Sequence, residues 1–140
     1  MRPLLSVLLL IIPFTLFGQK DSGDIWISKI NNRSIAGQCN YAWVLKPTTS
    51  DVDKIIRAGK KAEKKLVKLL TSDEKGVVAH YILSNIYKQT SYQILDMDTV
   101  KWETKFIYNG LEFTETEVGM VTDKATLDKC KDEWIKKLRE

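Results

Sequence analysis

The only histidine of this 140-residue chain, His80, stands four residues before Ser84 and seven before Tyr87. On a helix, residues at these spacings fall on one stripe, so the three side chains would face the same way. Such a stripe permits hydrogen bonding between an imidazole and a hydroxyl, as in the pair that activates a serine nucleophile. We therefore take His80, Ser84 and Tyr87 as ligand-contact candidates.

Two interpretations of His80 follow from its surroundings. A serine hydrolase also needs a nucleophile at a sharp turn, donors for the oxyanion and a third group that orients the histidine, and the sequence marks none of these. The segment 74–87, EKGVVAHYILSNIY, is largely apolar, which favours a core histidine whose ring nitrogens are bonded locally. We predict no catalytic residues, and the alternative is a small exported hydrolase that uses His80 and Ser84.

Metal and cofactor chemistry have no motif in this sequence. One histidine and two distant cysteines form no HExxH motif and no cysteine knuckles, and the acids form no calcium-binding loop. The seven glycines are dispersed, so no phosphate-binding loop is recognisable. We expect neither a metal site nor a cofactor.

The first eighteen residues, MRPLLSVLLLIIPFTLFG, have the pattern of an export signal. Arg2 precedes an apolar run that is shorter than the roughly 20 residues of a membrane span, and Gly18 offers a cleavage point. We expect residues 1–18 to be a signal peptide and the mature chain to be secreted or periplasmic. Removal of Arg2 lowers the formal charge from +4 to +3.

Export has a consequence for the two cysteines of the mature chain, Cys39 and Cys130. Disulfides form and persist outside the cytoplasm. The segment 39–45, CNYAWVL, is apolar enough to reach the core face on which Cys130 is expected. We predict a Cys39–Cys130 disulfide, and the alternative is two separately buried thiols.

A helix over residues 52–70, begun by Ser50 or Asp51, is predicted by apolar residues at three- and four-residue spacings. Its other face is basic, which indicates contact with an anionic protein, a polysaccharide or a membrane surface; the alternative is a solvated face. Nucleic acid is not an expected partner, because no aromatic residues are interleaved for base stacking. The cations of this basic face are Lys54, Arg57, Lys60, Lys61, Lys64, Lys65 and Lys68.

A second helix, capped by Asp73 and running to about Lys88, follows after a short turn and should pack antiparallel as a helical hairpin. The stretch LVKLLTSDEKGVVAHYILSNI resembles one HEAT-type helical repeat. Because HEAT-like arrays are generally binding scaffolds, the resemblance implies a surface for partners. The signal sequence combined with LKPT, AGKKAEKKLVKLL and AHYILSNIY also resembles small secreted bacterial proteins.

The next segment, VKWETKFIYNGLEFTETEV, alternates in polarity around Asn109-Gly110, a pair typical of tight hairpin turns. We expect a β-hairpin there, followed by a C-terminal helix over residues 123–138, capped by Thr122. One face of the first strand is predicted from Val100, Trp102, Thr104, Phe106 and Tyr108, and one stripe of the helix from Leu127, Cys130, Trp134 and Leu138.

About 120 residues remain after the signal, which is the usual size of one domain. We predict a single α+β domain over residues 19–140, made of a helical hairpin, a small antiparallel sheet and a C-terminal helix. The predicted function is that of an exported, non-catalytic binding or interaction protein. An inhibitor or immunity-type protein is one specific form of it.

Overall fold

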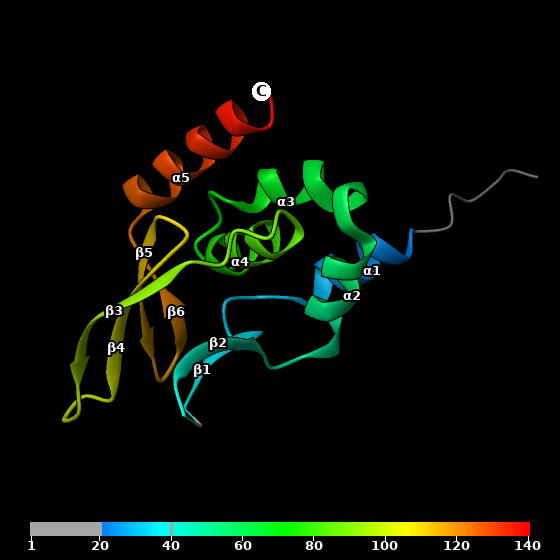
Figure 1. Ribbon diagram of the computed structural model, residues 1–140. Coiled ribbons are helices and arrows are strands. Elements are labelled where there is room, and N and C mark those ends of the chain that lie inside the picture. Colours follow the sequence, from blue (N-terminus) through cyan, green and yellow to red (C-terminus); the bar gives the residue numbers. More distant parts are fainter. Residues whose placement is uncertain (1–20, 40) are drawn as a thin grey trace, which may run out of the picture.

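The structure is a computed structural model that describes residues 21–39 and 41–140, so the predicted signal peptide lies outside the described residues (Figure 1). Helices and two small antiparallel sheets make up the described chain, which confirms the predicted α+β class. The elements are α1 (Ser22–Lys29), β1 (Ile35–Cys39), β2 (Trp43–Pro47), α2 (Ser50–Ala58), the 3-10 turn η1 (Gly59–Ala62), α3 (Glu63–Leu69), α4 (Gly76–Ile86), β3 (Tyr92–Asp98), β4 (Glu103–Tyr108), β5 (Leu111–Thr116), β6 (Gly119–Val121) and α5 (Lys124–Lys137).

The long basic helix predicted over residues 52–70 is not continuous. Gly59 has φ of +65°, a backbone conformation that residues with a Cβ rarely adopt, and it ends α2. The chain then makes the 3-10 turn η1 and resumes as α3. The apolar spacing predicted the buried face, with Val52 and Leu66 inside, but a glycine within that spacing did not reveal the break.

Helix α4 is the central element of the fold. Residues 76–84 are all buried, because α4 packs against α2, α3, α5 and β5. A Cβ on Gly76 would lie 2.6 Å from the Leu70 carbonyl oxygen and 2.8 Å from Leu127, so only glycine permits this close packing. The helix begins later than predicted, after Lys75, and the Asp73 side chain makes no cap.

Strands β3 to β6 form an antiparallel meander, with β3 and β6 at its edges. Asn109 and Gly110 have φ of +45° and +84° and join β4 to β5, as predicted. β3 was not predicted. The prediction that Val100 and Trp102 lie on the same strand as Phe106 is wrong: β4 starts at Glu103, and the two side chains are 88% and 76% exposed.

The two-stranded sheet β1–β2 lies against the inner face of the meander. Trp43 stacks on Phe106 with ring centroids 6.2 Å apart. A Cβ on Gly37, in the neighbouring strand, would lie 2.4 Å from the Trp43 ring and 2.7 Å from a carboxylate oxygen of Glu115. The absence of a side chain at Gly37 therefore lets the β1–β2 hairpin approach β5.

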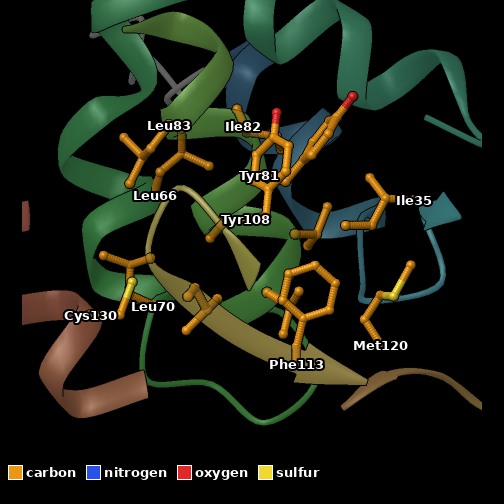
Figure 2. Packing of buried hydrophobic residues seen from close by; sticks show 14 of the residues in the cluster. Ile35, Leu66, Leu70, Tyr81, Ile82, Leu83, Tyr108, Phe113, Met120 and Cys130 are labelled. Atoms are coloured by element: carbon orange, nitrogen blue, oxygen red, sulfur yellow. The ribbon is translucent and has the colours of Figure 1, made fainter. Parts of the chain in front are cut away.

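A single hydrophobic cluster joins these elements (Figure 2). Leu66 of α3, Leu83 of α4, Ile35 of β1, Phe113 of β5 and Cys130 of α5 all belong to it. Helix α5 buries the predicted residues Leu127, Cys130 and Trp134, and its N-cap is Asp123 rather than Thr122.

Candidate functional site

His80 lies inside the core, 2% exposed, and both of its ring nitrogens have partners. The Trp134 indole N–H, on α5, donates to Nδ1 over 2.9 Å. Since an indole nitrogen can only donate, Nδ1 carries no proton. The proton is therefore on Nε2, which donates to the Tyr108 carbonyl oxygen on β4 over 2.7 Å. The ring thus connects α4 to α5 and to the sheet.

Burial makes this imidazole a weak base. It lowers the pKa of His80 from 6.5 to about 4, more than the hydrogen bond to the Tyr108 carbonyl raises it, and the nearby Lys137 charge lowers the pKa further. At neutral pH the ring is uncharged, which matches its tautomer and its place in the core. These features agree with a core histidine.

Ser84 has no exposed surface and lies beside His80 on the next turn of α4. Its hydroxyl oxygen is 3.5 Å from His80 Nε2 and accepts a 3.0 Å hydrogen bond from the Asn109 side-chain amide. A general base must offer a lone pair to the nucleophile, whereas Nε2 offers a proton that the Tyr108 carbonyl already accepts. The predicted stripe exists, but its geometry gives a hydrolase no activated nucleophile.

Tyr87, the third member of the predicted stripe, is half-buried and does not join a site with His80. Its hydroxyl donates to the Glu63 carboxylate, and its ring packs on Trp134 at 5.6 Å. Burial, with the Glu63 carboxylate beside it, raises the Tyr87 pKa to about 12. The contacts join α3, α4 and α5, which is a role in packing.

The structure contradicts the predicted disulfide, because both cysteines are free. Cys39 is exposed at the end of β1, while Cys130 is buried on α5 with its sulfur 3.1 Å from His80 Nδ1. Burial raises the pKa of the Cys130 thiol to about 12. The apolar stretch after Cys39 pairs with β1 as β2 and keeps Cys39 at the hairpin end instead of carrying it to the core.

The predicted basic face is divided by the break at Gly59. Lys54 pairs with Asp51 at 3.6 Å, Lys65 pairs with Asp24 at 2.5 Å, and Lys60 lies over the Tyr87 ring. Four cations of this basic face are exposed and make no ion pair or cation–π contact with other described residues: Arg57, Lys61, Lys64 and Lys68, which we call the free cations.

A cavity of about 320 Å³ adjoins the free cations, between α1 and the α2–η1 segment. Its lining includes the half-buried Trp26 and Ile27 on α1, together with Arg57 and Lys61. Asp21 adds one carboxylate. Positive charge and an aromatic ring therefore lie side by side on this surface.

A second surface, which the sequence did not predict, lies at the end of the four-stranded sheet that contains the β3–β4 turn. A groove of about 320 Å³ opens between the β3–β4 turn, the end of β5 and Trp43. We call it the Trp102 groove, and its lining residues are Trp43, Met97, Asp98, Thr99, Trp102, Glu103, Thr104, Glu115, Thr116 and Glu117.

Two features of the Trp102 groove are costly in a free protein. Met97 and Trp102 are 52% and 76% exposed, and the Trp43 indole N–H is buried without a hydrogen-bond partner among the described residues. An unpaired buried donor costs about 1–3 kcal/mol.

Among the residues that the structure describes, no group of three metal-ligating side chains gathers, and no helix has the length and apolarity to cross a membrane. Comparisons with family models, with curated proteins and with solved structures find no match for this chain. The function of the chain is therefore inferred from the surfaces described above.

Proposed function

We propose that the chain is an exported, non-catalytic binding protein whose free cations contact an acidic surface on a protein partner. The observation that carries the proposal is the group of exposed cations Arg57, Lys61, Lys64 and Lys68, which have no carboxylate partner within the described chain. An inhibitor or immunity-type protein is the specific form that such a contact suggests.

The cavity beside Trp26 favours a protein partner over a polysaccharide or a membrane surface. An acidic protein surface can place an apolar side chain against Trp26 while its carboxylates meet Arg57 and Lys61. A charged polysaccharide supplies the anions without that apolar side chain. The stretch that resembles a HEAT-type repeat, residues 66–86, contains Lys68 of the free cations and adds a partner surface as an expectation.

Export is part of the proposal and rests on the signal-like residues 1–18. Mass spectrometry of the exported fraction should find a chain that begins at Gln19 or Lys20. Intact Met1 on protein retained in the cytoplasm would contradict it.

The binding proposal is tested with three anionic probes: a blocked peptide of alternating glutamate and leucine, dextran sulfate, and phosphatidylcholine vesicles containing an anionic phospholipid. The variant replaces Lys61, Lys64 and Lys68 by glutamine. A matched control replaces Lys46, Lys129 and Lys136, which are also exposed but lie on other elements. Both variants lose the same charge.

We expect the parent to bind the peptide, and the face variant to bind it about tenfold more weakly, since each exposed ion pair contributes about 0.5 kcal/mol. The control should stay close to the parent. Equal losses in both variants would reduce the effect to net charge, and binding to the vesicles or dextran sulfate alone would reject a protein partner.

A further inference from the structure

The Trp102 groove lies at the end of the inner sheet face, beside Trp43 of the β1–β2 hairpin. Opposed residues share a face, so Met97, Thr104 and Glu115 form a rank across β3, β4 and β5. The preceding rank contains Phe106, on which Trp43 stacks. The β1–β2 hairpin therefore covers the sheet as far as Trp43 and Glu115, whose carboxylate accepts from the Gly37 N–H. Thr104 is buried, so the open member of this rank is Met97, beside Trp102.

The charge of the Trp102 groove is opposite to that of the whole chain. Its lining includes four carboxylates and no lysine or arginine, although the chain has a formal charge of +4. These acidic residues are Asp98, Glu103, Glu115 and Glu117; the Asp98 carboxylate accepts from the backbone N–H groups of Val100 and Lys101, and the Glu115 carboxylate accepts from that of Gly37. Together with two indole rings, they provide the environment in which a lysine or arginine side chain is stabilised by both ion pairing and cation–π contact.

The β3 edge indicates what kind of cation the groove accepts. β3 is the outer strand of the sheet, and its residues Met97 and Asp98 line the groove. An outer strand offers unpaired backbone N–H and C=O groups to an extended chain. Trp43 also lines the groove, and its buried indole N–H has no partner within the part of the chain that the structure describes. A polypeptide can form hydrogen bonds with the free backbone groups of this edge, whereas a small amine or a lipid headgroup cannot pair with a strand.

We propose that the Trp102 groove binds an extended basic segment of a partner protein, in which lysine or arginine alternates with apolar residues. The alternation follows from the strand edge, because successive side chains of an added strand point to opposite faces. Cationic side chains enter the groove between Trp102 and the four carboxylates, and the backbone pairs with β3. This proposal concerns another surface, of opposite charge, from the one in the proposed function.

A second copy of the chain is a poorer occupant of the groove. β3 has the sequence YQILDMD and carries no lysine or arginine, so a second copy that pairs through its own β3 edge brings no cation to the groove. The free cations lie on helical segments, which cannot add to a strand edge. Figure 1 also places the β3–β4 turn at the opposite end of the molecule from α1 and α2.

The test uses a blocked peptide of alternating lysine and valine, its glutamate–valine counterpart, and n-butylammonium as a small cation. Affinity is measured by calorimetry, and the position of the peptide is measured by NMR shifts of the β3 amides and the Trp43 indole N–H. Two variants remove groove features: Trp102→Ala, and Glu103→Gln combined with Glu117→Gln. Controls of the same chemistry lie elsewhere: Ile25→Ala, and Glu74→Gln combined with Glu133→Gln, all exposed.

We expect the lysine–valine peptide to bind and to shift the β3 amides, and each groove variant to weaken it about tenfold while the controls match the parent. Neither the glutamate–valine peptide, which the free cations are expected to bind, nor n-butylammonium should shift the β3 amides or the Trp43 indole N–H. The proposal is overturned if the peptide does not bind, if controls and groove variants lose affinity equally, or if n-butylammonium binds as well as the peptide. It is also overturned if sedimentation shows self-association that Trp102→Ala abolishes, because the occupant is then a second copy.

Discussion

The surroundings of His80 and the Trp102 groove are two polar regions joined by one strand, and they differ in what covers them. β4 gives its Tyr108 carbonyl to His80 at one end and its Thr104 to the groove at the other. Around His80, helices α4 and α5 close over the sheet, and both ring nitrogens are bonded. In the groove, an indole N–H has no partner and a tryptophan is exposed.

This difference indicates which of the two regions can bind a partner. A polar residue with all its bonds made inside the core stabilises the fold, and nothing is left for a ligand to satisfy. Exposed apolar side chains beside an unpaired donor and uncompensated charge leave bonds and area for a partner to supply. The unusual residue type, the single histidine, belongs to the first group.

The largest expected effect is that of His80→Ala. The change leaves the Trp134 indole N–H and the Tyr108 carbonyl without partners and opens a void in the core. We expect the free energy of unfolding to fall by about 3–5 kcal/mol. Urea or thermal unfolding of the variant measures the loss.

Two comparison variants sharpen that result. Ser84→Ala removes one oxygen and should cost about 1 kcal/mol. His80→Gln keeps a donor and an acceptor and should recover part of the loss. If His80→Ala leaves the unfolding free energy unchanged, the His80 ring does not stabilise the core, and the difference between this region and the groove disappears.

The second prediction concerns pH. The pKa of His80 is about 4 in the folded chain and 6.5 in the unfolded chain, so only the unfolded state binds the proton between these values. The stability that the neutral His80 ring contributes to the fold is fully present above pH 6.5 and is lost as pH falls toward 4. The loss is of the order of 3 kcal/mol.

Carboxylates also titrate below pH 6, so the measurement is a difference between two proteins. Unfolding free energies of the parent and of His80→Gln are followed from pH 7 to pH 4. The parent should lose more stability than the variant over this range. Parallel curves would mean that the ring is not held neutral by burial.

The third prediction tests the boundary between the two regions. Gly37→Ala puts a Cβ 2.4 Å from the Trp43 ring and 2.7 Å from Glu115, and the ring is held by its stack on Phe106. Overpacking of this kind costs about 1–3 kcal/mol. Gly23→Ala is the control, since its nearest neighbour lies at 3.7 Å within the first turn of α1. Gly23→Ala should leave the unfolding free energy equal or slightly higher. Similar losses in both variants would show that the close approach at Gly37 is not the cause.

The sequence predicted the parts of the fold that periodicity and turn chemistry determine. The buried face with Leu66, the Asn109-Gly110 turn and the inward stripe with Trp134 are all found in the structure. The break at Gly59 was missed because the apolar spacing continues across it. The disulfide was wrong because the position of Cys39 depends on the β1–β2 pairing, which no local pattern specifies.

The candidate groove could not be predicted from sequence for a related reason. Alternation from Val100 to Tyr108 suits a strand with one buried face, but burial of that face depends on which element lies over it. The β1–β2 hairpin reaches only Trp43, and β4 begins at Glu103. The same alternating residues thus divide into core and open surface according to a tertiary contact.

The smallest expected effect on stability is that of Trp102→Gly, and it separates the two regions most directly. Trp102 is exposed and has φ of +55°, in the left-handed region, where a residue with a Cβ is strained by about 1 kcal/mol. Glycine relieves that strain, but it also raises the conformational entropy of the unfolded chain, which destabilises the fold by a similar amount. The unfolding free energy should therefore change by less than about 1 kcal/mol. Trp134→Ala, which removes the same residue type from the His80 region, should cost about 3–5 kcal/mol. Comparable losses at the two tryptophans, measured by urea unfolding, would show that Trp102 supports the fold and would leave the groove without its exposed aromatic contact.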